Sequence, residues 1–282
     1  MTRTPGFEAL ALILAAALAG CVVEQSAYPP EQTAAVAPGT YAGPEEQASE
    51  PPPPLPVYEQ PPCPEEGYIW TPGLWRWGVE GYFWVPGTWV APPQPGMLWT
   101  PGYWEVVDVG YRFHHGYWGS HVGYYGGINY GGGYSGAGYV GGRWVNNRFQ
   151  YNTAVSNVNV TNIHNTYHQT VINNVAINNT HIQRASYIGG TAPRIRPTRI
   201  EAAAAREPRM APTPPQLQHH ETARTTPVLN AARNEGRPPI AATPRPGAFT
   251  GHGVTAAKPV GPAYHPQHAP PGQKEDRRPE RP

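Results

Sequence analysis

The sequence predicts a mainly β protein of short antiparallel hairpin repeats, with long N- and C-terminal flanks that lack stable structure. Three observations predict this class. An aromatic pattern around a central Pro-Gly recurs between residues 67 and 118. Gly and Pro together make up about a quarter of the 282 residues, close to the level typical of low complexity. Only 14% of the residues are charged. This composition argues against one compact domain over the full length.

The N-terminal segment 1–20 has the features of a secretory signal, because its apolar stretch at 9–19 is too short to cross a bilayer as a helix. Leu18, Ala19 and Gly20, directly before Cys21, resemble the bacterial lipobox. In that motif the cysteine thiol receives a diacylglyceryl group, and the signal is cut in front of it. An ordinary signal peptide, with Cys21 as an incidental thiol, is the alternative.

Lipidation at Cys21 places the chain in the cell envelope. Three acyl chains, as such lipoproteins usually carry, suffice for stable membrane attachment. Val22 rather than Asp follows the cysteine, which under the enterobacterial sorting pattern implies the outer membrane. We therefore expect an outer membrane lipoprotein that faces the periplasm or the cell surface.

The two flanks have opposite charge. Residues 22–66 contain eight glutamates and no Lys or Arg, whereas fifteen Lys and Arg against seven acids follow residue 183. We interpret 21–66 as an acidic Pro-rich linker and 188–282 as a basic Pro/Ala-rich tail. Both are expected to be mostly disordered, because such compositions bury too little apolar surface. Short helices are predicted near 200–207 and 216–224. Isolated helices of that length are only marginally stable in water.

The repeats cover residues 67–118. Copies of the pattern occupy 68–75, 82–89 and 97–104, and a degenerate fourth occupies 111–118. Alternating aromatic residues interrupted by Pro-Gly predict a strand, a two-residue turn and a returning strand. With Pro86 and Gly87 in the turn, Trp84 faces Trp89 across the hairpin. Successive hairpins are then expected side by side, as a meander or a small barrel-like layer. The predicted repeat core is Trp70, Trp75, Trp84, Trp89, Trp99, Trp104, Phe113 and Trp118.

An aromatic face of this size needs a cover, because soluble monomers do not leave so large an apolar patch in water. The expected cover is the β extension at 119–187, which is first rich in Gly and Tyr and then in Asn. Alternations such as 158–161 and 171–177 predict two or three amphipathic strands there. Asn-rich alternation also leaves self-association through strand edges open.

The repeats, the run 123–131 and the tail run 240–249 together resemble the bacterial YXWGXW repeat lipoproteins. The resemblance covers most of the mature chain and implies an envelope location and a repeat architecture. That family has no established activity, so the resemblance implies no mechanism. The family name describes a Trp-Gly pair, and this chain has Trp-Thr-Pro-Gly or Trp-Val-Pro-Gly at that place. Its fourth copy has Phe113 in place of Trp.

Catalysis is not expected, because Glu80, Glu105 and Asp108 are the only acids between residues 67 and 187. Ser120 and His121 lie near Asp108 without a nucleophile-elbow pattern. Metal ligation by His114, His115 and His121, or by His164 and His168, is the weaker interpretation beside polar surface histidines. We expect no cofactor and no metal.

The functional expectation is a lipid-anchored envelope protein with a structural or protein-interaction role. Its expected partners are the membrane, through the anchor, and anionic envelope polymer, either lipopolysaccharide or peptidoglycan, through the basic tail. Nucleic acid is not expected. The alternative is glycan binding, with Trp70, Trp84 and Trp99 exposed as platforms for sugar rings. Cys63 in Pro-Pro-Cys-Pro is expected to be exposed, as an inert free thiol rather than a site of intermolecular pairing.

Overall fold

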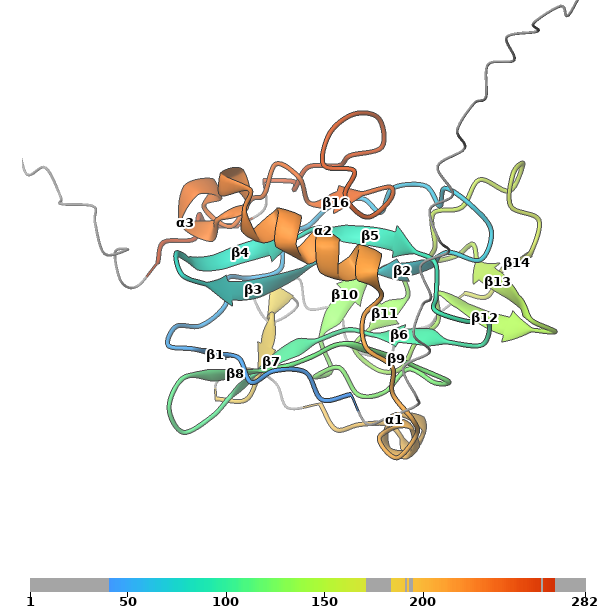
Figure 1. Cartoon of the computed structure of the whole chain (residues 1–282), viewed down its shortest axis with the longest axis horizontal. Coiled ribbons are helices and arrows are strands. Elements are labelled where there is room, and N and C mark those ends of the chain that lie inside the picture. Colours follow the sequence, from blue (N-terminus) through green and yellow to red (C-terminus); the bar gives the residue numbers. More distant parts are fainter. Residues whose placement is uncertain (1–40, 171–183, 191, 193–194, 260, 267–282) are drawn as a thin grey trace, which may run out of the picture. The chain divides into compact units, whose positions relative to one another are not determined.

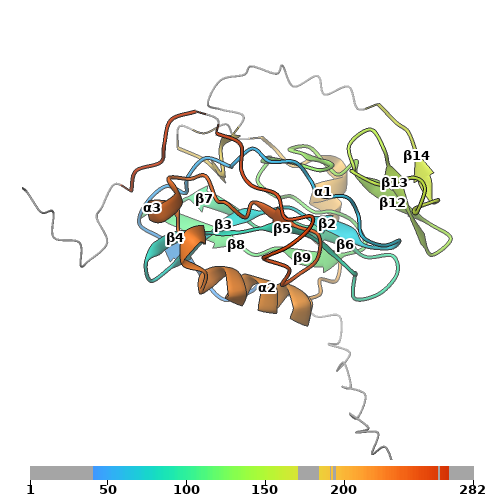
Figure 2. The same cartoon turned by 90° about the horizontal axis from the view of Figure 1, so that it is seen from above.

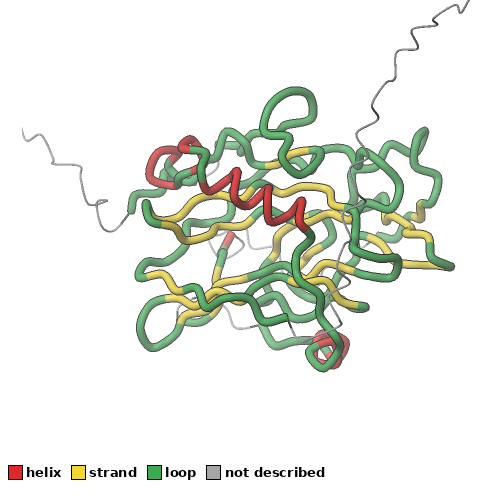
Figure 3. Tube along the Cα trace, viewed as in Figure 1, coloured by secondary structure: helices red, strands yellow, loops and turns green. Residues whose placement is uncertain are grey.

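The computed structural model describes residues 41–170, 184–190, 192, 195–259 and 261–266. The predicted lipobox, Leu18 to Gly20, and Cys21 lie outside the described residues, as does the alternation at 171–177. Within the described part the mainly β prediction is confirmed. Short strands joined by loops predominate, the helices are few, and no closed barrel forms among these strands (Figures 1 and 3).

The first repeat unit is a long hairpin with two bent arms. One arm consists of β2 (Ile69–Thr71) and β3 (Leu74–Gly78), and the other of β4 (Gly81–Val85) and β5 (Gly87–Val90). The inner strands β3 and β4 pair antiparallel, and β2 pairs antiparallel with β5 (Figure 1). The arms turn at Val79 and Glu80, between the paired Gly78 and Gly81.

The second unit repeats this plan. Its arms are β6 (Leu98–Thr100) with β7 (Tyr103–Val106), and β8 (Tyr111–His114) with β9 (Tyr117–Gly119). The inner strands β7 and β8 pair antiparallel, as do the outer strands β6 and β9. Equivalent positions in the two units are 29 residues apart, as Trp70 and Trp99 are. The four sequence repeats are therefore two structural units of two repeats each.

The prediction that each Pro-Gly makes a hairpin turn is wrong, and so is the meander of successive hairpins. Trp84 pairs with Trp75 rather than with Trp89, whose partner is Trp70. Each Pro-Gly instead bends one arm of a hairpin. The bend requires glycine for space rather than for conformation, since none of Gly73, Gly87 and the two equivalent glycines has a positive φ. A Cβ on Gly87 would lie 2.6 Å from Cζ2 of Trp70.

The extension after the repeats contains two further hairpins. Strands β10 (Asn129–Gly131) and β11 (Tyr134–Ser135) form the first. Strands β12 (Gly142–Val145) and β13 (Arg148–Asn152) form the second, and β14 (Thr166–Tyr167) adds to it in parallel. Asn146 and Asn147 both have positive φ, as a type I′ turn requires. The strand predicted at 158–161 is wrong, because these residues form turns and loop.

The C-terminal part differs from the expected disorder over residues 195–259. It contains α1 (Arg199–Ala204), α2 (Pro214–Arg224), the 3-10 turn η2 (Pro227–Leu229), α3 (Ala231–Asn234) and β16 (Ala242–Thr243). The two helices predicted near 200–207 and 216–224 correspond to α1 and α2. Helix α2 packs against β4, and β16 pairs in parallel with β5 (Figure 1). Ala223 and Leu229 are fully buried in this packing.

The N-terminal flank is also structured from residue 41. Strand β1 (Gln47–Ala48) pairs with β8, and on the far side of the β7–β8 hairpin β15 (Tyr187–Ile188) pairs with β7. The Pro-rich stretch after β1 packs through Leu55 and Cys63, both buried. Proline offers a carbonyl acceptor and no N–H that needs a partner. Such a stretch therefore suits a core rich in indole N–H donors.

Candidate functional site

All eight side chains of the predicted repeat core are buried, with exposed fractions between 0 and 7%. They meet as four edge-on or tilted cross-strand pairs. The outer pairs are Trp70 with Trp89 and Trp99 with Trp118, at ring centroid distances of 5.4 and 5.3 Å. The inner pairs, Trp75 with Trp84 and Trp104 with Phe113, both lie at 5.0 Å.

The Pro-Gly bends divide these pairs between two hydrophobic clusters. Both outer pairs lie in one cluster and both inner pairs lie in the other. Phe113 occupies the position of Trp84 in the first unit, so the degenerate fourth repeat keeps the architecture. The extension completes the first cluster with buried side chains and so covers the aromatic residues of the outer pairs. These include Val122, Tyr125, Tyr134, Phe149, Tyr151 and Ile163.

One tyrosine hydroxyl contacts backbone carbonyls at equivalent positions of the two units. The hydroxyl of Tyr134 lies 2.8 Å from the carbonyl oxygen of Trp99 and 3.2 Å from that of Trp70. Burial raises the pKa of Tyr134 well above its usual value, so the hydroxyl stays protonated and donates. A direct contact also joins the units, because Nε1 of Trp104 donates to the carbonyl of Trp75 at 2.8 Å.

The flanks supply acceptors for several of the other indole N–H groups. Trp89 donates to the carbonyl of Pro61 at 2.8 Å, and Trp84 donates to that of Ala241 at 2.9 Å. In the second unit, Nε1 of Trp118 donates to Oε1 of Gln216 on α2 at 2.8 Å. No local pattern indicates these bonds, because they join residues up to 157 positions apart. They explain why flanks of low hydrophobicity are ordered around the repeats.

The turns of the two inner hairpins carry the most exposed large apolar side chains of the described residues. Val79, at the β3–β4 turn, is 96% exposed, and Val109, at the β7–β8 turn, is 84% exposed. The rest of each hairpin is packed. The two repeat units therefore each present one apolar side chain to the surroundings.

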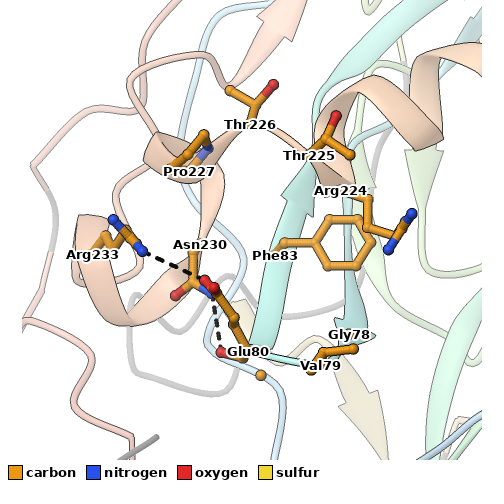
Figure 4. Close-up of a pocket in the computed structure, with 11 residues that line it drawn as sticks. Gly78, Val79, Glu80, Phe83, Arg224, Thr225, Thr226, Pro227, Asn230 and Arg233 are labelled. Carbon is orange, nitrogen blue, oxygen red and sulfur yellow. Dashed lines mark hydrogen bonds and ion pairs between the residues drawn. The ribbon is translucent and has the colours of Figure 1, made fainter. Parts of the chain in front are cut away.

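A cleft of about 360 Å³ lies at the first of these turns (Figure 4). We call it the hairpin-end cleft. Its walls come from the β3–β4 turn on one side and from the end of α2, η2 and α3 on the other (Figure 4). The lining residues are Gly78, Val79, Glu80, Gly81, Phe83, Arg224, Thr225, Thr226, Pro227, Asn230 and Arg233.

The polar groups of the hairpin-end cleft are paired within the chain. Arg233 lies 3.6 Å from a carboxylate oxygen of Glu80, and Nδ2 of Asn230 donates to the carbonyl of Glu80 at 3.0 Å (Figure 4). Arg224 pairs with Glu221 one helical turn earlier. The two ion pairs, Arg233 with Glu80 and Arg224 with Glu221, are solvent-exposed and contribute little to stability. They can exchange partners when another molecule binds.

Two histidines of α2, the buried His219 and the half-buried His220, lie where the helix packs against the repeats. Nε2 of His219 donates to the carbonyl of Pro86 at 2.9 Å, and its Nδ1 accepts the N–H of Gly247 at 3.0 Å. Both ring nitrogens are satisfied only in the neutral form, and burial lowers the pKa of His219 to about 4. Burial, followed by the charge of Arg76, lowers the pKa of His220 to about 4 as well.

The histidines considered as metal ligands have separate partners. His114 contacts Glu105 at 2.8 Å, His121 contacts Glu207 at 2.8 Å, and His168 contacts Thr153 at 3.0 Å. Among the described residues no group of three or more His, Cys, Asp or Glu side chains is arranged to hold a metal ion. Asp108, in the β7–β8 turn, and Ser120 are exposed.

Cys63 is buried, with 6% exposure, where the sequence predicted an exposed thiol. Its Sγ lies 3.2 Å from the carbonyl oxygen of Glu65 and 3.7 Å from the hydroxyl of Tyr151. The Pro-rich segment around Cys63 packs against the aromatic core. Its prolines therefore did not mark an exposed loop. Burial raises the pKa of the thiol to about 11.

The opposite charges of the two flanks meet in the folded chain. Lys258 lies 2.8 Å from Glu59, and Arg245 lies 3.3 Å from Glu65. A backbone hydrogen bond of 2.7 Å from Lys258 to Val57 accompanies the first pair. Part of the charge asymmetry of the sequence thus reflects contacts within the chain.

Comparison with known proteins supports the repeat assignment. The family model of the WXXGXW repeat matches two copies, at residues 67–90 and 95–118. These bounds coincide with the two structural units, β2–β5 and β6–β9, to within three residues. No curated protein and no solved structure is significantly similar to the chain. Within the described residues, none of the helices has the length and apolar character that a membrane span needs.

Proposed function

We propose that this chain, which carries two WXXGXW repeats, is a lipid-anchored protein of the bacterial envelope. Its proposed role is structural, by binding another protein, without catalysis. Cys21 is the lipidated residue, and the anchor holds the chain at the outer membrane. The sequence around Cys21 supports the anchor. The arrangement of the repeats supports the binding role.

The observation that carries the binding role is the contrast between the core and the hairpin ends. Packing within the chain uses all eight repeat-core aromatic side chains, while Val79 and Val109 stand almost fully in solvent. Isolated exposed apolar residues are common on protein surfaces. Here the inner turn of each unit carries one, at neighbouring rather than equivalent positions, since Val79 aligns with Asp108 and Val109 with Glu80. An exposed apolar side chain in both turns favours a contact surface at the hairpin ends.

The chemistry of the first end defines its partner. Val79 provides an apolar contact, and Arg224 and Arg233 line the same hairpin-end cleft (Figure 4). Their present carboxylate partners, Glu221 and Glu80, are exposed and exchangeable. The partner is therefore a protein surface that offers an apolar side chain next to acidic groups.

Glycan binding through tryptophan platforms has no comparable support. Trp70 and Trp84 are at most 1% exposed and Trp99 is 7% exposed, so none of them offers a ring face to a sugar. Binding of anionic polymer by the tail is a second proposal, with less support than the binding role of the hairpin ends. Arg245 and Lys258, two of the tail cations, already face glutamates of the N-terminal flank.

Site-specific cross-linking in intact cells tests the binding role. A photoreactive amino acid at Val79 or Val109 is expected to capture a distinct protein, whereas the same probe at Val160, which is 58% exposed in a loop, is expected to capture none. Equal capture patterns at all three positions would indicate random collision. Absence of any product at Val79 and Val109 would refute the role of the hairpin ends.

The anchor is tested separately. Cys21→Ala is expected to abolish labelling by palmitate and to release the chain from membranes, while Cys63→Ala is expected to leave both unchanged. Palmitate label that persists in Cys21→Ala would show that the anchor is elsewhere or absent. This result would leave the binding role of the hairpin ends untouched.

A further inference from the structure

A second cavity lies between the first repeat unit, the N-terminal flank and the Gly/Tyr-rich extension. Its volume is about 220 Å³. Leu55, Pro56 and Val57 of the flank provide apolar wall, and the rings of Tyr58 and Tyr130 add aromatic wall. We call it the Trp70 cavity. A space of this size and character holds a small organic molecule.

Two residues that line this cavity each have a buried N–H donor without a hydrogen-bond partner among the described residues. The donors are Nε1 of Trp70 and Nε2 of Gln60. Trp70 is only 1% exposed, so water outside the protein does not satisfy its N–H. An unpaired buried donor costs about 1 to 3 kcal/mol. The other indoles of the first unit's core each have an acceptor, at Pro54, Ala241 and Pro61.

The orientation of the Gln60 amide is fixed by its neighbours. Its Oε1 accepts the backbone N–H of Asn157 at 2.7 Å, and its backbone carbonyl accepts Nδ2 of Asn157 at 2.7 Å. Turning the amide would place two donors against each other. Nε2 is therefore the side of Gln60 that remains for another molecule, as a donor.

Gly132 is packed against the two donors at the wall of the cavity, so a ligand reaches them by displacing this glycine. A Cβ at this position would lie 2.7 Å from Nε1 of Trp70 and 2.9 Å from Nε2 of Gln60. Both nitrogens thus end beside the same bare stretch of backbone. A molecule that reaches this place meets both donors together.

A cationic side chain lines the cavity. Arg184 lines it, and no acidic residue does among the described lining residues. Nε of Arg184 donates to the carbonyl of Leu55 at 2.9 Å, which holds the guanidinium at the wall. Burial, followed by the charge of Arg237, lowers the pKa of Arg184 from its ordinary value. A neighbouring anion is favoured by both donors and by this charge.

We propose that the Trp70 cavity binds a small organic carboxylate. The carboxylate oxygens accept the N–H groups of Trp70 and Gln60 close to the Arg184 guanidinium, and an apolar body packs against the flank. The apolar walls favour a singly charged ligand over phosphate, because a dianion requires more compensating donors. This binding is independent of the anchor and of the hairpin ends.

Nuclear magnetic resonance of the indole N–H groups of the full chain in detergent micelles tests the proposal. Each of the nine tryptophans gives one such signal, and Trp70→Phe identifies the one from Trp70. Titration with sodium butyrate is expected to move the Trp70 signal downfield in a saturable way. Butyramide has the same size without the charge, and it is expected to bind about tenfold more weakly. Inorganic phosphate is expected to cause no saturable shift.

The matched controls are Trp99, at the equivalent position of the second unit, and the variant Gln60→Met. The Trp99 signal is expected to stay in place. Gln60→Met keeps the side-chain length, removes the donor and is expected to weaken butyrate binding about tenfold. A Trp70 signal that does not respond to butyrate, or that moves equally with butyramide or phosphate, would overturn the proposal.

Discussion

The indole of Trp84 lies directly over Gly73, so closely that a Cβ on this glycine would overlap Cζ2 of the ring. The same Cβ would lie 2.8 Å from the backbone nitrogen of Gly87 on the facing arm. This contact recurs at the other three bends, two of them Pro-Gly and the last His115-Gly116, with Trp70 over Gly87, Phe113 over Gly102 and Trp99 over Gly116. It explains why the repeat needs a glycine between its aromatic residues.

Gly73→Ala is therefore expected to destabilise the chain by about 3 kcal/mol, because overpacking a rigid ring against backbone leaves no room to adjust. Gly78→Ala is the matched control. Its Cβ would lie 3.3 Å from the ring of Phe83, which can shift, and the expected loss is about 1 kcal/mol or less. Urea denaturation of both variants measures the difference. Equal losses would contradict the packing of Trp84 over Gly73.

The pairing register of the first unit predicts which tryptophans are energetically coupled. A double-mutant cycle of Trp75→Leu and Trp84→Leu is expected to give a coupling energy of about 1 kcal/mol, because these rings meet edge-on at 5.0 Å. Trp84→Leu and Trp89→Leu are expected to be additive within about 0.5 kcal/mol, since the two rings belong to different clusters. The opposite ranking would restore a hairpin turn at Pro86-Gly87.

Sequence reasoning found which residues form the repeat core but not how they pair. Alternating aromatic residues around Pro-Gly fit a turn at Pro86-Gly87, and they fit equally a turn at Val79-Glu80. The choice depends on the fit of each indole over the facing glycine, which is a contact between two arms. Nothing in the spacing of one repeat reveals it. The pattern of two equal units became visible only with the pairing of β2 with β5.

That the flanks are folded was not predictable from the sequence, for a related reason. Their composition indicates too little apolar surface for an independent core, and local signals located only α1 and α2. The flanks are ordered by single bonds to distant indoles, such as the bond from Trp84 to the carbonyl of Ala241. The candidate sites share this origin. The Trp70 cavity joins Gln60, Trp70 and Gly132, which no local motif connects.

The two histidines of α2 predict an acid-sensitive fold. His219 titrates near pH 6.5 when unfolded and near 4 when folded, so the unfolded state binds more protons between these values. Stability is therefore full above pH 6.5 and falls as the pH drops towards 4, by about 3 kcal/mol for this residue. His220, with the same shift and cause, adds to the fall. Urea denaturation at pH 7.5 and pH 4.5 measures it.

His219→Gln is expected to reduce the loss of stability between pH 7.5 and pH 4.5, because glutamine does not titrate. His252→Gln, a replacement at an exposed position, is the control and is expected to leave the loss as in the parent chain. If His219→Gln shows the full acid sensitivity of the parent chain, His219 is not held neutral against Pro86.

The environment of Cys63 predicts a thiol that reacts only when the fold opens. Burial raises its pKa to about 11 and leaves it 6% exposed, so little thiolate is present at pH 8 and reagents cannot reach it. In a Cys21→Ser chain, where Cys63 is the one remaining thiol, a disulfide reagent is expected to label it at least a hundredfold faster in denaturant than in buffer. Tyr151→Phe removes the hydroxyl next to Sγ and is expected to leave the slow labelling in place, since burial dominates. Rapid labelling in buffer, or a disulfide-linked dimer formed on oxidation of the folded chain, would contradict the packed position of Cys63 against the aromatic core.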